Sequence, residues 1–133
     1  MTISHVFAEF DGKRRRFEIM REYLPSLDAR LDGGAYATLK RFIAGEWTFA
    51  DVQSVLAFGL YQPDSIEKLV MNMAQRMAGL GMAEPTVSPS TEQVRRTLIA
   101  DGHGNHAGLA VIVLRAAILG INEEEAEYEP DSE

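Results

Sequence analysis

The sequence predicts an α+β protein that is mostly α, with an N-terminal β-hairpin packed on a bundle of about five to six short helices. Three observations predict this class: an Asp-Gly turn signal between alternating residues near the N-terminus, apolar residues at helical spacing from residue 22 to residue 120, and an acidic end. We expect one domain at residues 1–121, with an inserted helix and linker at 62–89, and an acidic, disordered tail at 122–133.

The hairpin is predicted from SHVFAEFDGKRRRFEIM, residues 4–20. Gly12 accepts the positive φ of a type I′ turn, and a two-residue loop then pairs positions whose numbers sum to 23. One face collects the apolar side chains, namely Val6, Ala8, Phe10, Phe17 and Ile19. The other face pairs Glu9 with Arg14 and also carries Phe7, which indicates a contact other than solvent for this ring. Since a lone hairpin is marginal, it must lie on the helices or join a neighbouring chain.

A basic run, Lys13 to Arg16, lies on the second strand of this hairpin. Four residues without interleaved aromatic side chains are a weak nucleic-acid patch, and residues 1–122 are formally neutral, so we expect no nucleic-acid partner. The alternatives are a solvated strand edge or a site for an acidic surface. That surface is either the protein's own tail or a neighbour's.

Residues 22–60 carry signals for three helices. The first contains Leu24, Leu27 and Leu31 and ends at Gly33-Gly34. The second covers about 35–44, with apolar Leu39, Phe42 and Ile43, and ends at Gly45. The third begins at Thr48 as N-cap, with Asp51 three residues later in a variant of the capping box. Its apolar stripe consists of Phe49, Val52, Val55, Leu56 and Leu60.

Three more helices are expected beyond residue 62. The fourth includes Met73 and Met77, whose spacing favours core filling over an adaptable binding groove. The linker 81–90 precedes a fifth helix at 91–100, with Ser90 in a capping box. Asn105 caps the sixth, AGLAVIVLRAAILG, which is apolar apart from Arg115 and too short to cross a membrane, so we expect burial rather than an assembly surface. The residues expected to be nearly fully buried are Phe42, Val52, Leu56, Leu114 and Ile118.

The acidic tail carries the whole net charge of the chain. Seven of the 20 acidic residues lie in 123–133, which leaves 13 acidic and 13 basic residues before it. A block of like charge with one aromatic residue and one proline buries too little apolar surface to offset its ordering entropy, so it should be disordered. It is either a solubilising terminus or a partner-binding or self-shielding arm.

Candidate chemistry is confined to the loop from Asp101 to His106, which holds two histidines three residues apart. A zinc site needs more ligands at defined spacing, so we expect no metal. Phosphate loops, nucleophile elbows and acid–base pairs are also missing from the sequence, which predicts neither a cofactor nor an enzyme. The absence of cysteine fits a reducing cytoplasm.

The segments FDGKRRRFEI, LPSLDARL and YATLKRFIAGEWTFADVQSVLAFGL resemble the small tail protein of gene transfer agents and related siphophage-like prophages, which is named variously as tail tube protein or tail assembly chaperone. The likeness covers about residues 5–60, with a weaker echo at 90–120, and the chain departs from it at 62–89 and in its tail. The residues that fit the helical motif are Arg41, Phe42, Gly45, Trp47, Asp51, Val52, Leu56, Gly59 and Leu60.

The resemblance implies a cytoplasmic morphogenesis factor that binds the tail tape-measure protein and the major tail tube protein, with self-association as a further option and no membrane contact. Its competitors are a structural subunit associated with the tail tube, for which the sequence is too helical, and a helical regulatory domain. The residues proposed to bind partners are Phe7, Arg14, Arg15, Arg16, Trp47, Met73 and Met77.

Overall fold

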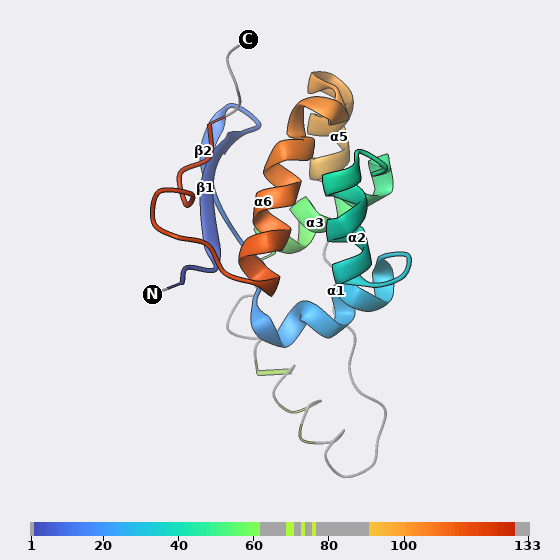
Figure 1. The fold of residues 1–133 in the computed structure, drawn as a ribbon, viewed down its shortest axis with the longest axis vertical. Helices are drawn as coiled ribbons and strands as arrows, with labels where there is room; N and C mark the ends of the chain where they lie inside the picture. Colours follow the sequence, from blue (N-terminus) through green and yellow to red (C-terminus); the bar gives the residue numbers. More distant parts are fainter. Residues whose placement is uncertain (1, 62–68, 71–72, 74–75, 77–90, 130–133) are drawn as a thin grey trace.

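The computed structural model describes residues 2–61, 69–70, 73, 76 and 91–129, and it shows an N-terminal hairpin beside a group of helices (Figure 1). The α+β, mostly α class is therefore confirmed. The elements follow in the order β1 (His5–Phe10), β2 (Lys13–Glu18), the 3-10 helix η1 (Arg21–Tyr23), α1 (Leu24–Arg30), α2 (Ala35–Ala44), α3 (Phe49–Leu60), α5 (Glu92–Asp101), the 3-10 helix η2 (His103–His106) and α6 (Ala107–Ile118).

The hairpin has the predicted register, with Val6 opposite Phe17 and Phe10 opposite Lys13. Both turn residues have positive φ, 52° at Asp11 and 80° at Gly12, as a type I′ turn requires. All five apolar residues predicted on the inner face are buried. The Asp11 carboxylate accepts hydrogen bonds from Arg15 at 3.1 Å and from Gln93 of α5 at 2.9 Å, so the turn is attached to the helices.

Helix α6 is the central element of the fold. It lies between the hairpin on one side and α2 on the other (Figure 1), and it also contacts α3. Its inner side chains Leu109, Val113 and Leu114 are at most 1% exposed, which confirms the predicted burial. The described part of the chain contains no helix with the length and hydropathy needed to span a bilayer.

Arg41 of α2 and Asp51 of α3 belong to the helical motif of residues 41–60, and their contact explains the spacing between these two residues. The Arg41 guanidinium donates to the Asp51 carboxylate at 2.9 Å, to the Thr38 hydroxyl at 2.9 Å and to the backbone carbonyl of Asp32 at 2.7 Å. Asp51 also completes the predicted capping box, because its other carboxylate oxygen accepts the Thr48 N–H at 3.0 Å. The pair of Arg41 and the buried Asp51 thus fixes α2 against the start of α3.

Two helical predictions, for Ile118 and Asn105, were wrong in detail, and the apolar Ile43 lies outside the core. Ile43 is 73% exposed, because it follows the buried Phe42 by one residue and so lies about 100° further around α2. Ile118 is only partly buried, at the last turn of α6 beside a shallow groove that Leu24 and Tyr36 also line. Asn105 does not cap α6, since its side chain donates to the Asp101 carbonyl at 2.6 Å and η2 intervenes before α6 begins.

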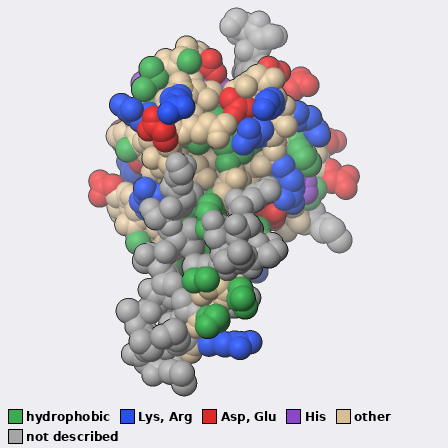
Figure 2. Space-filling view, turned by 180° about the vertical axis from the view of Figure 1, so that it is seen from behind, with side chains coloured by type: hydrophobic (Ala, Val, Ile, Leu, Met, Phe, Trp, Pro, Cys, Tyr) green, Lys and Arg blue, Asp and Glu red, His purple; other side chains and the backbone are tan. Residues whose placement is uncertain are grey.

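The predicted fourth helix is described only at residues 69–70, 73 and 76, which are helical. Leu69, Val70 and Met73 are each more than half exposed, so core filling was the wrong interpretation for Met73. Helical spacing identifies an apolar face, but it does not say what that face packs against. Green hydrophobic side chains are visible at this lower end of the molecule in Figure 2. Met77, Ser90 and the linker lie outside the described residues.

Candidate functional site

The outer edge of β1 is occupied by the C-terminal end of the chain. Alternate residues of a hairpin strand direct their backbone groups away from the partner strand, and Phe7 is such a residue. Its N–H donates to the Ala126 carbonyl at 2.7 Å, and its carbonyl accepts the Tyr128 N–H at 2.9 Å, which makes a parallel bridge to Glu127. Ile3 forms an antiparallel bridge with Ile121. Residues 121–129, here named the strap, therefore run beside β1 (Figure 1).

The strap corrects the prediction of a disordered tail for residues 122–129, while 130–133 lie outside the described residues. The prediction counted charges and missed the apolar residues among them. Ile121 and Ala126 are 3% and 6% exposed, and Tyr128 packs against the core. These side chains, together with the backbone pairing at Phe7, stabilise a segment that is otherwise acidic.

Arg14 is the cation of the basic run that meets the strap. It forms an ion pair with Glu127, and its guanidinium carbon lies 4.2 Å from the centre of the Phe7 ring. This is the contact that the position of Phe7 indicated, and the acidic surface that Arg14 contacts is the protein's own tail rather than the cross-strand Glu9. Both side chains of the ion pair are more than 60% exposed, so its contribution is at most about 1 kcal/mol.

Arg15 and Arg16 of the run have partners within the hairpin. Arg15 pairs with Asp11 at 3.1 Å and Arg16 pairs with Glu18 at 2.9 Å. Arg14 is therefore the member of the run whose charge faces the strap, whereas Arg15 holds the turn. Each arginine of the run therefore has its own acidic partner, and the run does not form one continuous basic surface.

Helix α6 supplies the second wall of the site. Arg115 forms an ion pair with Glu125, at the turn where the Glu125 N–H donates to the Asn122 side chain at 3.0 Å. A Cβ atom at Gly108 would lie 2.5 Å from the Tyr128 hydroxyl oxygen, so the ring has its place only because this position has no side chain. Gly108 and Arg115 are two helical turns apart and lie on one face of α6.

Sequence reasoning missed the strap side of the site, whose members are Gly108, Glu125, Ala126, Glu127 and Tyr128. A signal was present, because α6 is apolar except for Arg115 and contains a glycine seven residues earlier. The pattern Ala-Glu-Tyr also alternates apolar and acidic residues, as a strand with one buried face does. A composition count over eleven residues hides this alternation.

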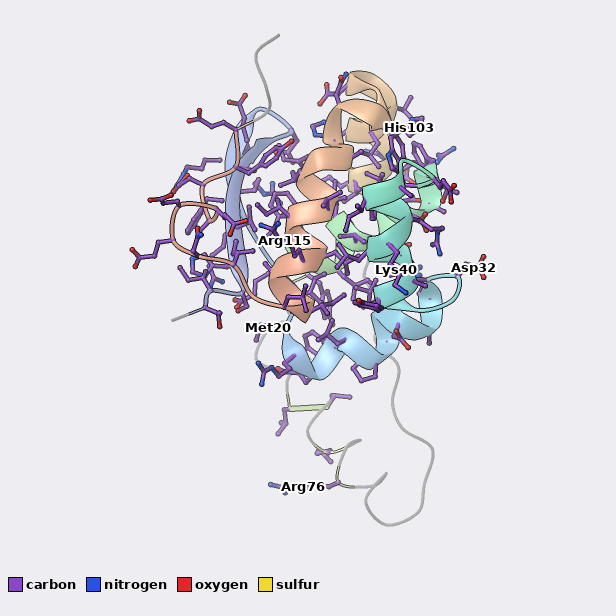
Figure 3. All side chains as sticks on the ribbon, viewed as in Figure 1. Met20, Asp32, Lys40, Arg76, His103 and Arg115 are labelled. Atoms are coloured by element: carbon purple, nitrogen blue, oxygen red, sulfur yellow. The ribbon has the colours of Figure 1, made fainter. Side chains whose placement is uncertain are left out.

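Trp47 and Met73 do not join this site, and Met77 lies outside the described residues. Trp47 is half-buried and stacks on Phe42 at a centroid distance of 6.5 Å, with the ring of His103 at 5.5 Å on its edge. Figure 3 places His103 at the upper end of the helices and Arg76, three residues after Met73 in the predicted fourth helix, at the lower end. Of the seven predicted residues, the structure brings Phe7 and Arg14 to the strap.

The two histidines of the predicted loop are used for packing. His106 bonds the Asp101 carboxylate at 3.0 Å and its ring lies 5.0 Å from that of Phe10, while His103 contacts Trp47 and Phe49. Among the residues that the structure describes, no three His, Cys, Asp or Glu side chains gather where they could hold a metal ion.

We expect the fold to be independent of metal. Treatment of the purified protein with EDTA should leave its thermal midpoint within about 1 °C of the untreated value, because metal-dependent folds lose their binding free energy when the ion is removed. Differential scanning calorimetry with and without chelator checks this. A stoichiometric zinc signal by elemental analysis, together with a lower midpoint after chelation, would show that the histidines do bind metal.

Comparison of the chain with protein-family models, with curated proteins and with solved structures gave no match. The site is therefore interpreted from its own contacts: an extended segment on the edge of a hairpin, held by backbone hydrogen bonds, an exposed ion pair and an aromatic ring on a helix.

Proposed function

We propose that this chain is a non-enzymatic tail morphogenesis protein of a phage, prophage or gene transfer agent, acting as an assembly chaperone. In this role it holds the tape-measure and tail tube proteins in the bacterial cytoplasm until they are assembled. The observation that carries the proposal is the outer edge of β1, which binds an extended segment through the backbone of Phe7. Backbone pairing of this kind lets a strand edge bind an extended segment of another protein, while the neighbouring side-chain positions decide which sequences fit.

Exposed apolar side chains support a role in holding other proteins. Leu69 and Met73 lie one helical turn apart and are each more than half exposed, with Val70 beside them. Tyr36 and Leu119 are similarly exposed, and Tyr36 borders the shallow groove at the end of α6. Apolar surface of this kind is typical of proteins that cover hydrophobic segments of a partner.

The resemblance of residues 5–60 to the gene transfer agent tail protein supplies the choice of partners. The motif residues Arg41 and Asp51 stabilise the helix pair and do not form a catalytic arrangement. The motif thus maintains a scaffold that presents the hairpin, and the hairpin offers the binding edge. A chaperone role requires both the helical scaffold and the binding edge of the hairpin.

Co-expression tests this function. A tape-measure or tail tube protein should give several-fold more soluble product when this chain is co-expressed with it, and it should copurify with the chain. Phe7→Asp should reduce copurification strongly, because it replaces the ring beside Arg14 with a carboxylate that neutralises this cation of the binding edge. Ile99→Asp is the matched control, since Ile99 is 61% exposed on α5 and contacts neither β1 nor the strap in any described interaction.

Partner solubility that is the same with and without the chain would contradict the chaperone role. A chain found at fixed stoichiometry in purified particles would instead favour a structural subunit of the tail. Equal loss of copurification in Phe7→Asp and Ile99→Asp would place the binding surface elsewhere.

A further inference from the structure

The strap shows in detail what kind of segment fits beside β1. Three consecutive residues fill three different positions. Ala126 is buried and its carbonyl accepts the Phe7 N–H, Glu127 pairs with Arg14, and Tyr128 lies over Gly108 of α6. The segment runs parallel to β1. Together, these contact positions form a binding surface between the strand edge and α6, here named the groove, which accepts a small apolar, an acidic and an aromatic residue in that order.

We propose that this groove is a peptide-binding site, and that an acidic, aromatic-containing extended segment of a partner protein occupies it in place of residues 126–129. The inference deepens the proposed function and rests on it for the existence of a partner. Residues 126–129 of the strap then compete with the partner segment for the groove. A partner segment binds only if it provides the same backbone pairing, the same negative charge and an aromatic ring.

The contacts of residues 126–129 are suited to release. The pairing at Phe7 consists of two backbone hydrogen bonds, the ion pair to Arg14 is exposed, and Tyr128 is only partly buried. A separate anchor holds the chain upstream, where Ile121 is buried and exchanges two hydrogen bonds with Ile3 at 2.7 and 2.9 Å. The end of the strap can therefore leave the groove while Ile121 stays in place.

Tethering sets the strength of the competition. A segment joined by a short linker has an effective concentration on the order of millimolar at its site, so weakly binding segments from solution do not displace it. A partner must bind the groove well or hold a second surface of the protein at the same time. The strap thereby excludes chance peptides from a strand edge that would otherwise accept them.

The test uses full-length protein and a fluorescent peptide with the sequence of residues 122–133, NEEEAEYEPDSE. Tyr128→Ala weakens the internal strap, so the peptide should bind this variant at least tenfold more tightly than the wild type in fluorescence anisotropy. Glu127→Lys is a second opening variant that should act in the same direction. A peptide in which the tyrosine is alanine should not bind either variant.

Gly108→Ala is the decisive control. Added to Tyr128→Ala, it fills the place of the aromatic ring and should abolish the gain in peptide affinity. Alanine is the better helix former, so loss of binding would not come from unfolding of α6, which circular dichroism verifies. A charge exchange provides an independent arm: Arg14→Glu in the Tyr128→Ala background should lose the peptide and regain it when the peptide carries lysine in place of Glu127.

Equal peptide affinity of the wild type and both opening variants would contradict the proposal that the groove binds the peptide. So would unchanged peptide binding when Gly108→Ala is added to Tyr128→Ala. Concentration-dependent oligomers of the wild type that Gly108→Ala dissociates would overturn the choice of occupant, because a second copy would then supply the segment. The peptide assay uses no tail protein, so its result is separate from the co-expression test. Peptide binding without partner capture would contradict the proposed function alone.

Discussion

Replacing Leu56 or Leu114 by alanine should lower the free energy of unfolding by about 2–5 kcal/mol. Both side chains are completely buried, Leu56 on α3 and Leu114 on α6, where the two helices pack against each other. The loss combines the transfer free energy of the removed methyl groups with the cavity that a close-packed core cannot fully close. Chemical denaturation followed by far-ultraviolet circular dichroism measures it.

Leu119→Ala is the matched control for these two variants. Leu119 directly follows α6 and is 61% exposed, so the same substitution there should change the free energy of unfolding by less than about 0.5 kcal/mol. Unchanged denaturation midpoints for both Leu56→Ala and Leu114→Ala would mean that these stripes do not form the core.

Asp51→Ala should lower the free energy of unfolding by about 3 kcal/mol, near the lower end of the range for breaking a buried ion pair. The substitution leaves the Arg41 guanidinium, whose side chain is 24% exposed, without its carboxylate, and it also removes the acceptor of the Thr48 N–H at the start of α3. Both effects act on the junction of α2 and α3. Denaturant titration of the purified variant gives the difference.

Asp32→Ala is the control for this prediction, because Asp32 contacts Arg41 through its backbone carbonyl and its side chain lies at the outside of the molecule (Figure 3). It should change stability by less than about 0.5 kcal/mol. If Asp51→Ala were as stable as Asp32→Ala, the network around Arg41 would not be what maintains the motif.

Features fixed by neighbouring residues were predictable from the sequence. The hairpin register follows from the Asp-Gly turn, and the capping box follows from the spacing of Thr48 and Asp51. The end of α2 at Gly45 is equally local, since its φ of 75° suits glycine. In each case the signal and the structure that it specifies lie within a few residues of each other.

Features that depend on tertiary packing were not predictable in the same way. Ile43 and Met73 have helical spacing, but only the arrangement of the helices decides that they face outward. The strap is the clearest example, because Tyr128 is positioned by Gly108, twenty residues earlier, and Ala126 by Phe7 at the other end of the chain. Phe7 and Arg14 were identified from the hairpin pattern, and the tail was one of two acidic surfaces predicted for the basic run, but the tail residues that make the contact were not predicted.

The candidate site contains both locally determined features and features that depend on tertiary packing. The hairpin is built locally and stands beside α6, while the strap returns from the end of α6 to cover the free side of β1 (Figure 1). Residues 122–129 therefore have a position in the free protein, where Glu127 and Glu125 complement the charges of Arg14 and Arg115. In the proposed function, a tail protein occupies this position during assembly.

A disulfide across the strap tests this central claim most directly. The chain has no cysteine, and Phe7 and Glu127 are bridge partners on neighbouring strands, a spacing that a disulfide can span. The measurement is capture of the copurifying tail protein by the Phe7→Cys/Glu127→Cys variant before and after reduction. The account predicts that the oxidised protein, with its strap closed, loses the partner and that reduction restores capture to the level of the Phe7→Cys single variant, which lacks the ring but keeps the backbone pairing. Equal capture in the oxidised and reduced states would contradict it.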